Sequence, residues 1–135
     1  MIIMNKLEKR LSKAVKNPEN AIVLGTGIDS LPEFLKVFRT VFLFSFDPQP
    51  LKARNLVYRE NFNSPDIVTD VSVIFVDLNH LSYLEKLVPV WQRWRPTILI
   101  EGNEPIDRSK SKLLYDHGYR CVDQQGFFHT WKLQT

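Results

Sequence analysis

Short apolar runs that alternate with helix-like segments constrain the fold of this chain most strongly. Four runs end at a glycine or an acidic residue: AIVLG (21–25), TVFLFSFD (40–47), VSVIFVD (71–77) and PTILIEG (96–102). A strand that is apolar along its whole length must be buried on both faces, which is typical of a parallel sheet covered by helices on both sides. The pattern therefore predicts an α/β fold with a mostly parallel sheet.

Three further segments bring the expected number of strands to seven. One strand is expected around residues 55–59, and residues 119–125 and 127–133 are interpreted as a hairpin joined near Gly126. The hairpin makes the last strand antiparallel. We therefore expect a compact α/β sandwich with a mostly parallel, seven-stranded sheet and an antiparallel last strand.

The helices that connect these strands are fewer than in a complete α/β sheet. Apolar residues recur at helical spacing over residues 30–38, 81–94 and 107–117. Pro89 should start, kink or interrupt the second helix, and Gly118 suits the left-handed residue that ends the third. The connections PQPLKARN (48–55) and NFNSPD (61–66) are too short for helices, so we expect a reduced helix complement.

At 135 residues the chain is expected to form one domain, residues 1–135. Residues 1–19 are expected to form a leading amphipathic helix with a narrow apolar stripe, and residues 20–135 form the α/β core. Residues 1–20 carry five basic and two acidic side chains, whereas the remaining 115 residues carry thirteen of each. A basic helix can contact nucleic acid, but a solvated surface is its commoner role. Nucleic acid is therefore not an expected partner, and a homo-oligomer is left open.

Three features favour a cytoplasmic protein that does not enter a membrane. No signal-peptide pattern is visible, and no apolar run approaches the ~20 residues that a membrane-spanning helix needs. The single cysteine, Cys121, cannot form an internal disulfide, which favours a reducing compartment. Cys121 lies in a late strand without an obvious base, so we expect a small core residue rather than a nucleophile.

Polar residues gather where the expected strands end. In parallel α/β sheets, ligands bind at the carboxyl ends of the strands, near the point where the strand order reverses. The residues expected to share this edge of the sheet are Gly25, Thr26, Gly27, Asp47, Asp77, Asn79, His80, Glu101 and Asn103.

Gly25 and Gly27 let backbone N–H groups approach a ligand closely, and the helix that follows favours negative charge at its N-terminus. The same two glycines also fit a tight turn without a ligand. Asp47 follows them by roughly twenty residues, a spacing at which an acidic residue can accept hydrogen bonds from ribose hydroxyls. Alternatively, Asp47 caps its own backbone turn in FDPQP.

Asp77, Asn79 and His80 are candidates for chemistry beside such a ligand. A carboxylate and an imidazole so close in sequence can act as acid and base, or bind a divalent metal, and Glu101 and Asn103 from the next strand end could complete such a site. In a purely structural alternative, Asn79 caps the next helix and His80 lies on its exposed first turn.

The segment WQRWRP (91–96) alternates tryptophan and arginine and could stack on a base or another ligand. The helical spacing of Trp91 and Trp94 favours packing in the core instead.

Three stretches resemble motifs of the class I, Rossmann-like family of S-adenosylmethionine-dependent methyltransferases. AIVLGTGIDS is similar to the glycine motif after the first strand, and FSFDPQP to a second strand that ends in an acidic residue. VSVIFVDLNHLSY and WRPTILIEGNE are similar to the fourth and fifth strands of the family, and the final hairpin also matches. The resemblance covers about residues 20–135 and implies a Rossmann-like three-layer sandwich.

The resemblance also implies S-adenosylmethionine as the cofactor. It would sit over Gly25, Thr26 and Gly27, with Asp47 on its ribose and Asp77 beside its methionine part.

Catalytic roles are implied for Asp77 and His80, one of which would remove a proton from the methyl acceptor. Asn79, His80 and Glu101 would face that acceptor. The implied function is a methyltransferase with an unidentified, small-molecule acceptor.

The alternative is a catalytically inactive methyltransferase-like domain that serves as an interaction or assembly module. Val23 stands where the family usually has an acidic residue, and Asp29 where a third glycine is common. Exposed aromatic residues such as Phe62, Trp91 or Phe127 would then be buried at a subunit contact.

Overall fold

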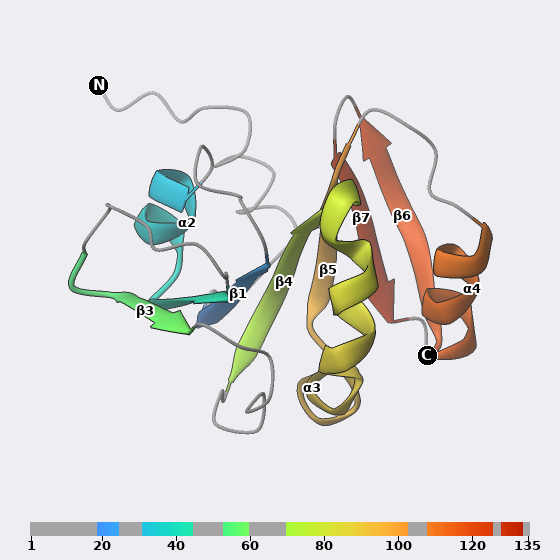
Figure 1. Ribbon diagram of the computed structural model, residues 1–135, viewed down its shortest axis with the longest axis horizontal. Helices are drawn as coiled ribbons and strands as arrows, with labels where there is room; N and C mark the ends of the chain where they lie inside the picture. Colours follow the sequence, from blue (N-terminus) through green and yellow to red (C-terminus); the bar gives the residue numbers. More distant parts are fainter. Residues whose placement is uncertain are drawn as a thin grey trace.

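The structure, a computed structural model, describes residues 19–24, 31–44, 53–59, 70–102, 108–125 and 128–133. The expected helix of residues 1–19 lies outside this part of the chain, apart from Glu19. Seven strands of the described residues form one sheet in the order β3-β2-β1-β4-β5-β7-β6 (Figure 1). The strands are β1 (Asn20–Leu24), β2 (Thr40–Phe44), β3 (Leu56–Arg59), β4 (Val71–Asp77), β5 (Thr97–Glu101), β6 (Tyr119–Gln125) and β7 (Phe128–Leu133).

The strand directions confirm the predicted fold class. β1 is parallel to β2 and β4, β2 is parallel to β3, and β4 is parallel to β5. β7 is antiparallel to both of its neighbours, β5 and β6. The strand order reverses between β1 and β4, because the chain first builds outward to β3 and then continues on the other side of β1.

The described helical segments are α2 (Leu31–Val37), the 3₁₀ helix η3 (Leu78–Leu87), α3 (Val88–Trp94) and α4 (Arg108–Asp116). The prediction for Pro89 is confirmed, because this residue lies in the first turn of α3, directly after η3. Proline is tolerated there since the first N–H groups of a helix have no intrahelical acceptor. The expected helix 81–94 is therefore two helices of different type.

Side chains of the central strands alternate between two separate cores, one on each face of the sheet. One core joins β1, β4 and β5 to η3, α3 and α4, and it contains Ile22, Leu24, Ile74, Val76, Leu84, Leu87, Trp91, Ile98, Ile100 and Leu114. The other joins the same strands to α2 and contains Ala21, Val23, Phe34, Phe38, Val73, Phe75 and Leu99. Both faces of the central strands are thus buried, as their continuous apolar sequences predict.

Trp91 packs in the core, which confirms the structural interpretation of the WQRWRP segment for this residue. Its side chain is 2% exposed, and its ring lies edge-on to the rings of His117 and Tyr119 at 5.4 and 5.8 Å between centroids. A subunit contact through Trp91 is therefore excluded, while Phe62 and Phe127 lie outside the described residues.

Gly118 ends α4 in the left-handed conformation, with φ of 87°, as its position in the sequence predicts. Its backbone N–H donates to the carbonyl of Tyr115 at 3.0 Å. A Cβ atom at this position would lie 3.0 Å from Cδ1 of Leu133, so both conformation and space favour glycine.

We predict that Gly118→Ala lowers the free energy of unfolding by about 1–2 kcal/mol, because alanine adds backbone strain and a close contact with Leu133. Urea denaturation followed by circular dichroism measures the change. The exposed Gln92 offers a control, since Gln92→Ala should change stability by less than about 0.5 kcal/mol. An unchanged midpoint for Gly118→Ala would contradict the strain argument.

Candidate functional site

The carboxyl edge of the sheet, where β1 and β4 end side by side, is the candidate site. Leu24 at the end of β1 is the Cα partner of Phe44 in β2 and of Val76 in β4. The carboxyl ends of these three strands therefore lie at one edge of the sheet. The strand order reverses between β1 and β4, which is the position where open α/β sheets bind ligands.

Asp77 and Glu101 are brought together at this edge. They are Cα partners at the ends of β4 and β5, and both are half-buried. The alternation of side chains along each strand places them on the face of Phe75 and Leu99, which is the face covered by α2. Two carboxylates are thus neighbours on one face of the sheet, and they favour a cationic or hydrogen-bond-donating group.

Asp77 also directly precedes η3, and its geometry corrects the alternative in which Asn79 caps this helix. It is the N-cap residue of η3, in an extended conformation with φ of −89° and ψ of 168°, and its side chain makes no capping hydrogen bond. Asn79 and His80 are the second and third residues of η3, so Asn79 is not the helix cap. The capping part of the alternative is wrong because η3 starts directly at the end of β4, before Asn79, whereas His80 does lie in the first turn of the helix. The side chains of Asn79 and His80 lie outside the described part of the structure.

The other predicted site residues also lie outside the described residues. These are Gly25, Thr26, Gly27, Asp47 and Asn103. Among the described side chains, no group of three or more His, Cys, Asp or Glu residues is arranged to hold a metal ion. The roles of these residues, and a metal site completed by His80, stay predictions.

Cys121 is exposed, so the prediction of a core cysteine is wrong. It lies in β6 at the end of the strand order, where residues 120–124 are all exposed. An edge strand lacks a neighbour on one side, so an apolar residue in it need not be buried. Partial burial raises the pKa of the Cys121 thiol. The hydrogen bond from Sγ to the Asp123 carbonyl lowers this pKa and the Asp123 carboxylate raises it, and the net result is a raised pKa. A raised pKa makes this thiol a weak nucleophile.

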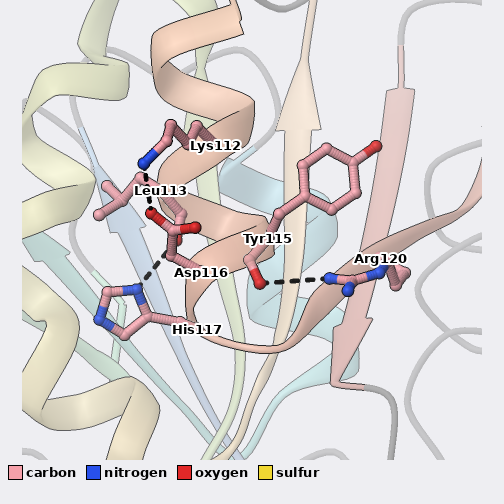
Figure 2. A network of polar contacts seen from close by, with 6 residues as sticks. All are labelled: Lys112, Leu113, Tyr115, Asp116, His117 and Arg120. Carbon is pink, nitrogen blue, oxygen red and sulfur yellow. Dashed lines mark hydrogen bonds and ion pairs between the residues drawn. The ribbon is translucent and has the colours of Figure 1, made fainter.

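A polar network at the end of α4 was not predicted from the sequence. Figure 2 shows Lys112 paired with Asp116 at 3.0 Å and the His117 ring Nδ1 at 2.9 Å from the Leu113 carbonyl. Both contacts join residues four apart in sequence, which is the spacing that could have revealed them. They fix the last turn of the helix.

Burial keeps the phenol of Tyr119 protonated beside this network. The side chain is 1% exposed, its hydroxyl donates to the Pro96 carbonyl at 2.8 Å, and burial raises its pKa strongly. Tyr119 therefore acts as a core residue that joins β6 to the start of β5.

The described helices include none that is long and apolar enough to cross a membrane.

Comparison with solved structures finds 30 chains that share this fold. One is precorrin-6y C5,15-methyltransferase from Geobacter metallireducens, with a TM-score of 0.64 and 14% identity over 98% of this chain and 90% of that chain. A Streptococcus mutans protein assigned as a methyltransferase and solved with S-adenosylhomocysteine has a TM-score of 0.59 and 11% identity, over 97% and 99% of the two chains.

A third similar structure is assigned as a type II methyltransferase from Anaeromyxobacter dehalogenans. Its TM-score is 0.54 and its identity 16%, over 82% of this chain and 56% of that chain, so the present chain spans about half of its length. No family model and no curated protein sequence matches the chain. The structural likeness confirms the predicted resemblance at the level of fold: the chain has the Rossmann-like fold of class I S-adenosylmethionine-dependent methyltransferases.

We predict that Cys121 reacts completely with a thiol-specific disulfide reagent in the native protein, but more slowly than free cysteine at pH 7.5. The thiol is exposed, and a raised pKa lowers its thiolate fraction, so the rate should rise about tenfold per pH unit below that pKa. Absorbance of the released thiolate measures the rate, with Cys121→Ser as the blank. A rate above that of free cysteine would contradict the raised pKa.

Proposed function

We propose that the protein binds S-adenosylmethionine at the carboxyl edge of its sheet and transfers the methyl group to a small-molecule acceptor. The observation that carries the proposal is the reversal of strand order between β1 and β4, which is where parallel α/β sheets bind ligands. Methyltransferases among the solved structures with this fold support it, including one with S-adenosylhomocysteine bound. We propose the cytoplasm as its compartment, since Cys121 is a free thiol.

In this proposal the cofactor lies over Gly25, Thr26 and Gly27, and Asp47 accepts hydrogen bonds from its ribose. Asp77 lies beside its methionine part. The described residues fit such a ligand, because Asp77 and Glu101 are half-buried partners at the end of β4 and β5. The Asp77 carboxylate favours the positive sulfonium and ammonium groups that S-adenosylmethionine carries, and Glu101 beside it faces the acceptor.

The cofactor, when bound, supplies a methyl group on a positively charged sulfur. The main task of the protein would be to hold the acceptor in line with that methyl group. Asp77 or His80 takes the proton that the acceptor loses, and Asn79 and Glu101 hold the acceptor by hydrogen bonds.

An inactive interaction module is the second candidate, and two observations favour it. Val23 is fully buried in the core shared with Phe34 and Phe75, so this position offers no polar group to a ligand. The edge strand β6 exposes Val122, at 46% of its surface, beside Cys121. An open strand edge with apolar side chains can pair with a second copy of the chain.

We predict that the protein binds S-adenosylhomocysteine in calorimetric titration, and that Asp77→Asn and Asp47→Ala each weaken binding about tenfold or more. Loss of a charge-assisted hydrogen bond costs roughly 1.5–3 kcal/mol, which corresponds to such a change. Asp123→Asn is the matched control, because Asp123 is an exposed acidic residue on β6, three strands away from β4 in the sheet.

Two outcomes would reject the proposal. One is no heat of binding at roughly millimolar ligand, and the other is equal loss of affinity in the Asp123→Asn control. Absence of binding combined with a dimer in sedimentation analysis would favour the interaction module.

A further inference from the structure

Charge is distributed unevenly over residues 21–135, the part of the chain that follows the leading segment. Residues 78–96 and 108–120 together carry seven Lys and Arg against two Asp and Glu, whereas the rest of residues 21–135 carries six against eleven. The net charge of residues 21–135 is therefore zero because a basic part and an acidic part cancel.

The basic segments form one layer of the structure, the helical layer of η3, α3 and α4 with the start of β6. The three helices share one core cluster on the same face of the sheet (Figure 1). Its described basic side chains are all exposed: Lys86, Arg93, Arg95, Lys112 and Arg120. This face of the molecule thus presents positive charge to solvent.

Aromatic rings accompany three of these cations. The guanidinium of Arg93 lies 5.2 Å from the centroid of the Trp94 ring, and that of Arg120 lies 4.9 Å from the centroid of the Tyr115 ring. On η3, the Lys86 ammonium lies 5.6 Å from the Tyr83 ring centroid. Each of the three rings is exposed or half-buried. Exposed cations beside accessible rings suit a ligand that combines negative charge with flat aromatic groups.

The two arginine–aromatic pairs lie near the C-terminal ends of α3 and α4. Close to these ends, the Trp91 ring of α3 lies 5.4 Å from the ring of His117, which directly follows α4. Arg120 is held in position, because its Nη1 donates to the carbonyl of Tyr115 at 3.2 Å (Figure 2) and to that of Tyr119 at 2.8 Å. A cation that is already ordered loses less side-chain entropy when it binds a phosphate.

Arg95 adds an observation on the backbone. It ends α3 with φ of 50° and ψ of 49°, the left-handed conformation that α4 gives to Gly118. Glycine adopts this conformation without strain, whereas arginine does not. A strained residue at an exposed position is retained more readily where its side chain has a use. A positive charge at a helix C-terminus also stabilises the helix, so stability and binding have to be measured separately.

We propose that the helical layer binds single-stranded nucleic acid, with phosphates on Arg93, Arg95 and Arg120 and bases stacked beside Trp94 and Tyr115. Arg95 lies just before β5 and Arg120 at the start of β6, so this surface is separate from the carboxyl edge, and the proposal does not depend on methyltransferase activity. Acidic peptides and anionic lipids would use the cations but would have no aromatic bases for the rings. Single-stranded nucleic acid uses both.

The test measures fluorescence anisotropy of a fluorescein-labelled 20-nucleotide RNA of mixed sequence with the 135-residue chain. Three phosphate contacts predict that affinity falls about 20-fold between 50 and 200 mM KCl. Arg93→Gln and Arg120→Gln should each weaken binding about fivefold, since each removes one contact. Arg39→Gln is the matched control: Arg39 precedes β2, outside the helical layer, and its side chain is 80% exposed.

Arg95→Gly separates a binding role from a structural one. Glycine relieves the backbone strain, so Tm should rise by about 3 °C, while RNA affinity should fall about fivefold. A structural arginine would change Tm and leave RNA affinity unaltered. Binding of S-adenosylhomocysteine should stay the same in this variant, which keeps the two proposals distinguishable.

Three results would overturn the proposal. The first is an RNA affinity that stays unchanged in the variants Arg93→Gln, Arg95→Gly and Arg120→Gln. The second is loss of binding only in Lys9→Gln/Lys13→Gln, which would assign it to the leading segment. The third is binding to phosphatidylserine vesicles as tight as to RNA, with the same dependence on these arginines.

Discussion

Burial of the central strands on both faces is the constraint on which the rest of the structure depends. β1, β4 and β5 contribute side chains to both cores, so helices have to cover each face. Parallel neighbours in turn bring the ends of these strands to one edge, where polar residues can gather without disturbing either core. The position of the candidate site is thus a consequence of how the apolar residues are buried.

The sequence predicts best those features that depend on one local physical cause. Continuous apolar runs indicate buried parallel strands, Pro89 indicates that a helix starts, kinks or breaks there, and Gly118 fits a left-handed residue. Features that depend on a strand's place in the sheet are harder to predict. Cys121 lies in a segment that is expected to be a strand, yet this strand, β6, is at an edge of the sheet and the thiol is exposed. Likewise, η3 begins directly after Asp77, so the N-cap residue is Asp77 and not Asn79.

The candidate site was likewise predictable only where one local cause determines it. That Asp77 and Glu101 share an edge follows from the alternation of strands and helices, and their pairing in register follows only from the sheet. The distribution of charge shows a related limit. A charge count over residues 21–135 includes Lys86 and Glu101 in the same neutral total. In the fold, Lys86 lies in the helical layer and Glu101 at the edge of the sheet. A charge sum along the chain cannot separate two surfaces that alternate in sequence.

The position of β7 has a consequence for biosynthesis. β7 lies between β5 and β6, and β6 has no other partner in the described sheet. β6 leaves the ribosome before β7, so it must wait for residues 128–133 before it can join the sheet. A nascent chain that stops at β6 would leave one side of β5 unpaired, with Leu99 and Ile100 beside an open edge. Translation has to pass the last hairpin before the sheet can close, and truncated products should be readily recognised by chaperones and proteases.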